Sequence, residues 1–225
     1  MNANATILTE CSFGVSYDRL LQVLTDVVPF ELSWKELTII NLHGRRVESI
    51  VRLKEFLPNL DEADLAENQL AYLTGLSAPI RFLSVADNRL SDLTSFAHIR
   101  NLETLDISGN RAITSIFQLS CLNHLRVLKA DRCSIVDISG IDQLNGLVSV
   151  SLSGNKIEVV RLDKTAWRRV ENLDLSDNSV NELTGIEKLP VLKALVLGEL
   201  SGVLAFCMAC IADCASALYR RQQAS

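Results

Sequence analysis

The segment from Leu102 to Asn110 reads LETLDISGN and combines two local signals. Its alternating apolar residues place Leu105 and Ile107 on one face of a short strand. Beyond them the chain must turn sharply, which leaves polar backbone groups inside the molecule. The amide of Asn110 can satisfy such groups because it is both a donor and an acceptor. The segment therefore predicts a strand that ends in an asparagine-stabilised turn.

The same pattern, L-x-x-L-x-L-x-x-N-x-L, recurs along most of the chain. Successive copies begin 20 to 23 residues apart, at Leu37, Leu60, Ile80, Leu102, Leu125, Leu147 and Val170, and an eighth begins at Leu192. A chance leucine-rich sequence would not keep this register for so long. We therefore predict an α/β leucine-rich repeat solenoid of seven full turns plus a broken eighth, with a parallel concave sheet and a convex side of short 3₁₀ or irregular segments.

One position in each turn is expected to stabilise the fold rather than to bind a partner. We call these residues the asparagine ladder: Asn68, Asn88, Asn110, Cys133, Asn155 and Asn178. Cys133 replaces asparagine in the fifth turn, which the general repeat pattern permits. Arg45 and Leu200 break the ladder at its two ends, where repeats are commonly atypical.

The returning half of each turn carries apolar residues at every third position. The third turn shows this period at Leu90, Leu93, Phe96 and Ile99. A strict three-residue period favours a 3₁₀-like or irregular segment over a long α-helix.

The pattern divides the chain into three parts. Residues 1–36 are predicted to form an N-terminal cap with a helix, because apolar residues recur at helical spacing over 17–32. Residues 37–197 form the repeat domain, and residues 198–225 form an apolar, atypical tail. Three interpretations of the tail stay open: a buried capping helix, a membrane anchor, or the product of a mis-assigned reading of the gene. Asp213 argues against an anchor, because a carboxylate is costly inside a bilayer.

Composition and motifs argue against several functional classes. The formal net charge of −5 is unlike that of a nucleic-acid binder. His43, His98 and His124 fall at different phases of the repeat and are not expected to form a site. Cys207-x-x-Cys210 has metal or redox spacing, but only Cys214 offers a further ligand nearby. Phosphate-loop, dinucleotide and nucleophile-elbow motifs are absent from the sequence. We predict a monomeric, non-catalytic protein without metal, cofactor or small-molecule substrate.

The absence of a basic region followed by an apolar stretch at Met1–Glu10 disfavours secretion, so we expect a cytoplasmic location.

The outward side chains of the concave sheet, here called the strand face, are the expected binding surface for a protein partner. At the outward repeat positions 3, 5, 7 and 8 of the seven full turns there are eight acidic residues and two basic ones, Lys129 and Arg132. The net charge at these positions is therefore −6. Such a surface favours an extended basic peptide. Phe82 is the predicted apolar anchor. The candidate binding residues are Glu62, Asp64, Phe82, Thr104, Asp106, Val127, Lys129 and Asp174.

Two segments carry a more specific resemblance. Residues 93–110 and 119–131 are similar to the repeat domain of the fungal septation-initiation or mitotic-exit network scaffold of the spindle pole body, which is centriolin-related. This resemblance implies a scaffold that binds signalling or spindle-pole proteins and is located at the spindle pole body. The 22-residue turns also resemble the short intracellular class typified by a protein phosphatase 1 regulatory subunit. The alternative function is therefore a regulatory subunit that docks a phosphatase catalytic domain on its concave face.

Overall fold

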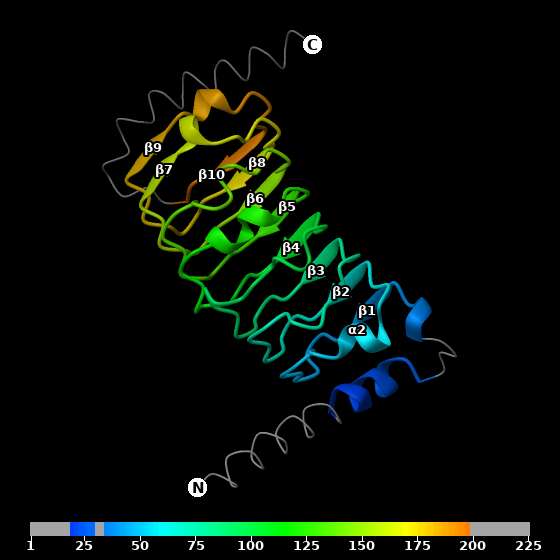
Figure 1. The fold of residues 1–225 in the computed structure, drawn as a ribbon. Coiled ribbons are helices and arrows are strands. Elements are labelled where there is room, and N and C mark those ends of the chain that lie inside the picture. Colours follow the sequence, from blue (N-terminus) through cyan, green and yellow to red (C-terminus); the bar gives the residue numbers. More distant parts are fainter. Residues whose placement is uncertain (1–18, 30–33, 199–225) are drawn as a thin grey trace, which may run out of the picture.

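The computed structural model describes residues 19–29 and 34–198. Its main feature is an eight-stranded parallel sheet in the order β1-β2-β3-β4-β5-β6-β8-β10. Figure 1 shows these strands stacked along the molecule. Each of the seven full turns contributes one strand and the eighth turn adds the last, so the predicted solenoid is confirmed. The strands are β1 Ile39–Asn41, β2 Glu62–Asp64, β3 Phe82–Ser84, β4 Thr104–Asp106, β5 Val127–Lys129, β6 Ser149–Ser151, β8 Asn172–Asp174 and β10 Ala194–Val196.

The core lies directly behind this sheet. In the fourth turn Leu105 and Ile107 are completely buried, as their alternation predicts. The equivalent residues of neighbouring turns pair in register, for example Leu83 with Leu105 and Leu105 with Leu128. Apolar side chains of successive turns therefore stack into one continuous core.

The returning halves contain only short regular segments in the described part of the chain. The helical ones are α2 Leu53–Phe56 and the 3₁₀ helices η2 Phe117–Cys121, η3 Leu162–Lys164 and η4 Ile186–Lys188, while η1 Trp34–Glu36 precedes the first strand.

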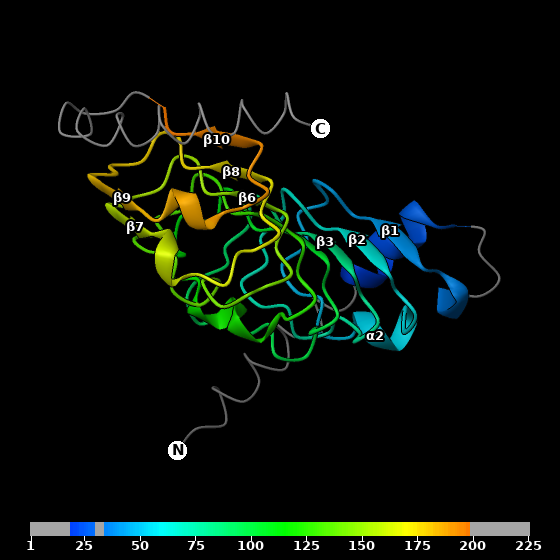
Figure 2. The same ribbon diagram turned by 90° about the horizontal axis from the view of Figure 1, so that it is seen from above.

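A second, two-stranded sheet was not predicted. It pairs β7 Val159–Arg161 with β9 Glu182–Thr184 in parallel, apart from the main sheet (Figure 2). Val160 and Leu183 are buried side by side, and Arg161 forms an ion pair with Glu182 at 2.9 Å. The backbones of the sixth and seventh turns are both extended at this point, so they can pair in register.

The three-residue period of the third turn is interrupted at Leu93. Leu90, Phe96 and Ile99 are buried, but Leu93 is 81% exposed and Thr94 takes the inward position at 1%. The Thr94 hydroxyl accepts a hydrogen bond from the Ser91 N–H and donates one to the Ala71 carbonyl. Two partly buried backbone groups are satisfied in this way, which compensates for turning a leucine outward.

The two ends of the solenoid differ. Residues 19–27 are helical, and Leu20, Val23 and Leu24 are buried in the core cluster. At the other end Leu195 of β10 is only partly buried, whereas Leu173 of β8 is buried.

The tail beyond residue 198, including the Cys207-x-x-Cys210 spacing, lies outside the described residues. The three-part division of the chain stays a prediction. Over 19–29 and 34–198, none of the helices combines the length and apolarity required to cross a bilayer.

Candidate functional site

The strand register brings the predicted binding residues into rows. Glu62 pairs with Phe82, Phe82 with Thr104, and Thr104 with Val127. Neighbouring strands are about 4.8 Å apart, so these four side chains form one continuous row across the strand face. Glu62 is exposed, whereas the other three are half-buried.

Phe82 owes part of its burial to a neighbour in sequence. The Arg81 guanidinium lies over the Phe82 ring, 5.2 Å from its centroid. The exposed part of the ring can still contact a partner, but Phe82 is less free than an isolated surface phenylalanine. Sequence alone identified the residue and could not show this stacking.

A second row on the strand face lies two residues further along each strand, and its aspartates have a structural role as well as a charge. One carboxylate oxygen each of Asp64, Asp106 and Asp174 accepts the backbone N–H two residues later, at 2.9 to 3.0 Å. Such bonds close a turn by imitating a backbone contact. Lys129 lies in the same row, paired with Asp106 across the sheet, and its side chain is exposed. Only the second oxygen of each aspartate is therefore free of this turn bond.

The asparagine ladder lies just after the strands. The Asn110 Oδ1 accepts the Leu90 N–H at 2.9 Å, and its Nδ2 donates to the carbonyls of Val85 and Ile107 at 3.0 and 2.7 Å. Equivalent bonds from side chain to backbone are made by Asn68, Asn88, Asn155 and Asn178. Each asparagine therefore joins its own turn to the preceding one.

Cys133 interrupts this ladder where the preceding turn is longer. The fourth turn has one extra residue between Asn110 and the buried Ile113, and the Ile113 N–H donates to the Asn110 carbonyl instead. The Cys133 Sγ makes only weak contacts with the carbonyls of Ile107 and Asp131, at 3.5 and 3.6 Å. Burial raises the pKa of this thiol to about 11, so it stays protonated at neutral pH.

Several charges at the margin of the strand face occupy strained backbone positions. Glu67, Asp87, Arg132 and Asp177 have φ between 50° and 54°, at the position where other turns carry glycine. This left-handed conformation costs on the order of 1 kcal/mol for a residue with a side chain. Gly109 shows the steric limit, because a Cβ there would lie 2.1 Å from the Asp87 Oδ1.

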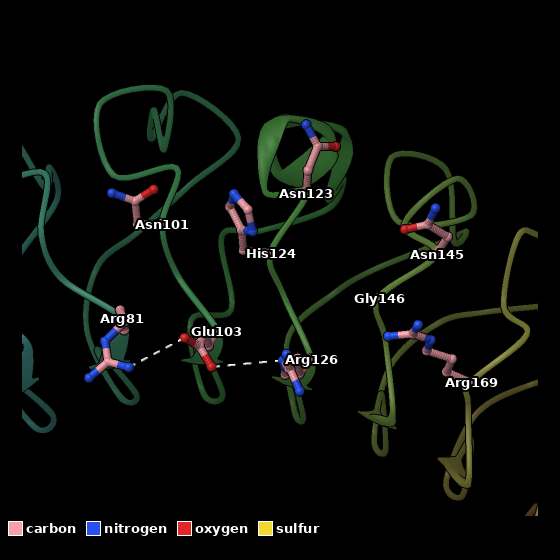
Figure 3. A pocket seen from close by; sticks show the side chains of 9 residues that line it. All are labelled: Arg81, Asn101, Glu103, Asn123, His124, Arg126, Asn145, Gly146 and Arg169. Carbon is pink, nitrogen blue, oxygen red and sulfur yellow. Dashed lines mark hydrogen bonds and ion pairs between the residues drawn. The ribbon is translucent and has the colours of Figure 1, made fainter.

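A second surface lies at the edge where the strands begin, and we call it the edge groove. It is a cavity of about 360 Å³ (Figure 3) lined by Arg81, Asn101, Glu103, Asn123, His124, Arg126, Asn145, Gly146 and Arg169. Arg81 makes a two-point ion pair with Asp61 at 2.6 and 2.7 Å, which lowers the pKa of that carboxyl. Glu103 lies between Arg81 and Arg126, at 3.5 and 3.8 Å.

The sequence analysis missed this groove. Its residues come from the end of one turn and the beginning of the next, and no motif connects them. One signal was available: an asparagine recurs every 22 residues, at 101, 123 and 145.

The histidines have separate surroundings. His43 lies 3.7 Å from Asp64 and 3.5 Å from Glu67 at the strand face. The His98 ring is half-buried, 3.0 Å from the Leu73 carbonyl, and the exposed His124 lines the edge groove. The three histidines therefore lie in separate parts of the described structure.

Comparisons with known proteins identify the repeat class. Residues 80–122 match the family described as Leucine Rich repeats (2 copies). The fold is also that of an internalin C2 from Listeria monocytogenes, with a TM-score of 0.72 and 23% identity over 83% of this chain and 88% of that one.

Two fungal proteins show a more specific similarity. The chain is 43% identical over 99 residues to the septation initiation network scaffold protein cdc11 of Schizosaccharomyces pombe, over 44% of this chain and 10% of that protein. It is 26% identical over 174 residues to protein NUD1 of Saccharomyces cerevisiae, over 75% of this chain and 20% of that protein. The chain thus spans between a tenth and a fifth of the length of these relatives.

A mammalian protein is similar over a comparable stretch. Leucine-rich repeat-containing protein 23 of Bos taurus is 33% identical over 180 residues, covering 77% of this chain and 51% of that protein. The chain is therefore a leucine-rich repeat protein, and its repeats are related to those of the fungal septation scaffold and NUD1.

Proposed function

We propose that the chain is a non-catalytic, protein-binding module of a septation or mitotic-exit signalling scaffold, acting at the spindle pole body. The observation that carries this proposal is the 43% identity over 99 residues to a protein named for that scaffold role. The fold supports it, because a stacked solenoid presents an extended rigid surface suited to binding another protein. We further propose that the chain acts as a cytoplasmic monomer with protein partners, and not with nucleic acid or small-molecule substrates.

The strand face is the proposed binding surface. A partner in extended conformation can lie across β2 to β5, where Glu62, Phe82, Thr104 and Val127 form one row. The half-buried Phe82 ring would supply apolar contact area, since binding energy concentrates in a few aromatic and apolar anchors. Acidic residues on either side would attract basic side chains of the partner and speed its encounter.

The strained charges at the margin give this proposal physical support. Three of the four strained residues, Glu67, Asp87 and Asp177, are acidic, and the fourth is Arg132; glycine would relieve the backbone at each of these positions. Strain of this kind often marks functional surfaces, because stability alone does not account for it. A negative potential along the strand face offers such an account.

The alternative of a phosphatase regulatory subunit receives no support from the relatives described above. It predicts a different partner on the same surface, so one experiment separates the two. The tagged chain is captured from dividing fungal cells, and its partners are identified by mass spectrometry. Recovery of septation-network or spindle-pole components is the expected result. A phosphatase catalytic subunit as the main partner would overturn the proposal in favour of the alternative.

Matched variants locate the surface. Phe82→Ala should make the free energy of binding less favourable by about 2 kcal/mol or more, as expected for an anchor residue. Leu93→Ala is the control, because it truncates a more exposed apolar side chain on the returning side. Both variants are first compared with the parent by thermal unfolding, since Phe82 is partly buried. A stably folded Phe82→Ala chain that still binds at parental affinity would move the site away from the strand face.

A further inference from the structure

The edge groove differs in charge from the rest of the molecule. The chain has a net charge of −5. The groove lining instead contains three arginines against the single carboxylate of Glu103, and Asp61 beside the lining pairs with Arg81, which leaves a formal net charge of +1. A local excess of arginine on an acidic chain favours an anionic ligand at that place.

Two of the arginines have their guanidinium groups available. Arg81 is engaged by Asp61 at 2.6 and 2.7 Å. Arg126 is 63% exposed, and its ion pair within residues 19–29 and 34–198 is with Glu103, at 3.8 Å. Arg169 is exposed and, within the described residues, forms neither an ion pair nor a side-chain hydrogen bond.

The hollow between these two arginines lies beside Gly146, which contributes no side chain (Figure 3). The amides of Asn123 and Asn145 line the same hollow. Neither amide makes a hydrogen bond to another described residue. Two exposed arginines, of which Arg126 pairs with Glu103 at 3.8 Å, and two amides therefore line one cavity.

These groups match a phosphorylated protein segment. A guanidinium group binds phosphate oxygens in two-point fashion, and a phosphoserine carries about −1.5 to −2 charges at neutral pH. Two arginines are needed to balance that charge, whereas one would suffice for a carboxylate. The amides can bind the peptide groups of an extended chain.

We propose that the edge groove binds a phosphorylated segment of a partner protein, with Arg126 and Arg169 on the phosphate and Asn123 and Asn145 on the adjoining backbone. A nucleic acid fits less well, because its continuous negative charge would meet the acidic remainder of the chain. This second surface does not depend on the proposed role of the strand face.

The test uses the full chain and a pool of fluorescent peptides of about nine residues with central phosphoserine in random flanks. The matched pool carries serine instead. Fluorescence anisotropy should show that the phosphorylated pool binds at least about tenfold more tightly than the serine pool. A charge-assisted hydrogen bond contributes at least that factor. In ¹⁵N spectra the Gly146 amide should shift as the phosphorylated pool is added.

Charge-matched variants locate the binding. The double substitution Arg126→Gln and Arg169→Gln should reduce the affinity for the phosphorylated pool about tenfold or more. Arg89→Gln with Arg111→Gln is the control, because it removes the same charge from exposed residues just after the ladder. Lys129→Glu changes only the strand face and should leave phosphopeptide binding intact, so failure of either proposal can be recognised separately.

Several results would overturn the inference. Equal affinity for the two pools would show that phosphate is not recognised, and equal losses in both double variants would show nonspecific charge attraction. Inorganic phosphate that binds as tightly as the phosphorylated pool would indicate a small-anion site. Binding to phosphoinositide-containing vesicles without binding to peptide would indicate a membrane ligand.

Discussion

Where each strand ends, at what we call the trailing edge of the strand face, the asparagine amides are buried or half-buried. Where each strand begins, at the leading edge, the arginines are exposed and the glutamates are half-buried. Asn110 is completely buried and bridges two turns, whereas Asn101 at the leading edge is exposed and donates once, to the Ala78 carbonyl. The trailing edge therefore contributes stability, and the leading edge is free to vary its charges for binding. Substitutions at both edges, and on the face between them, test this division.

The largest expected effect is at the trailing edge. Asn110→Ala leaves backbone groups of Leu90, Val85 and Ile107 without their side-chain partner, at roughly 1–3 kcal/mol for each group left unpaired. Asn101→Ala makes the same chemical change at the leading edge and should cost no more than about 0.5 kcal/mol. Urea unfolding measures both. Equal stability of the two variants would contradict the division between the edges.

The second prediction concerns alkaline pH at Cys133. The folded pKa of about 11 exceeds the ordinary value of 9.0, so the thiol contribution to stability is complete below pH 9. It is lost as the pH rises from 9 to 11, because only the unfolded chain then deprotonates there. The loss should be on the order of 2 kcal/mol. Subtracting the pH profile of Cys133→Ala from that of the parent isolates this loss, and parallel profiles would show that the thiol is not protected by burial.

A smaller effect is expected for the aspartates of the strand face. Asp106→Ala removes the bond to the Ser108 N–H and should destabilise the fold by about 1 kcal/mol. Lys129→Ala, in the same row, should leave the unfolding midpoint unchanged because the side chain is exposed. If Asp106→Ala is as stable as the parent, the bond to the Ser108 N–H does not stabilise the fold, and the Asp106 carboxylate has a role only in binding.

The smallest effect on stability is expected at the leading edge. Arg81→Gln breaks the ion pair with Asp61, but Arg81 is exposed and Asp61 is only half-buried, so solvent screens the pair and the unfolding midpoint should hardly move. The pKa of Asp61 should rise toward its ordinary value, because the Arg81 hydrogen bond is the main cause of its lowering. A carboxylate-selective NMR titration detects that rise. A marked loss of stability would instead give the leading edge a structural role.

The sequence by itself determined the solenoid and its register. The spacing of 20 to 23 residues, the alternation within each strand and the asparagine after it are local patterns repeated in every full turn but for small changes. Because identical turns must stack to bury their leucines, the pairing of Glu62 with Phe82 and Thr104 followed from the alignment alone.

Only the tertiary structure decided features that depend on contacts between turns. Leu93 and Thr94 exchange places because a carbonyl of the preceding turn requires a donor. The pairing of β7 with β9 requires two consecutive turns with extended returning backbones. The edge groove is built from residues that are about 20 residues apart in sequence and adjacent in space. A repeat pattern records what its turns share, whereas a binding groove arises from the side chains by which those turns differ.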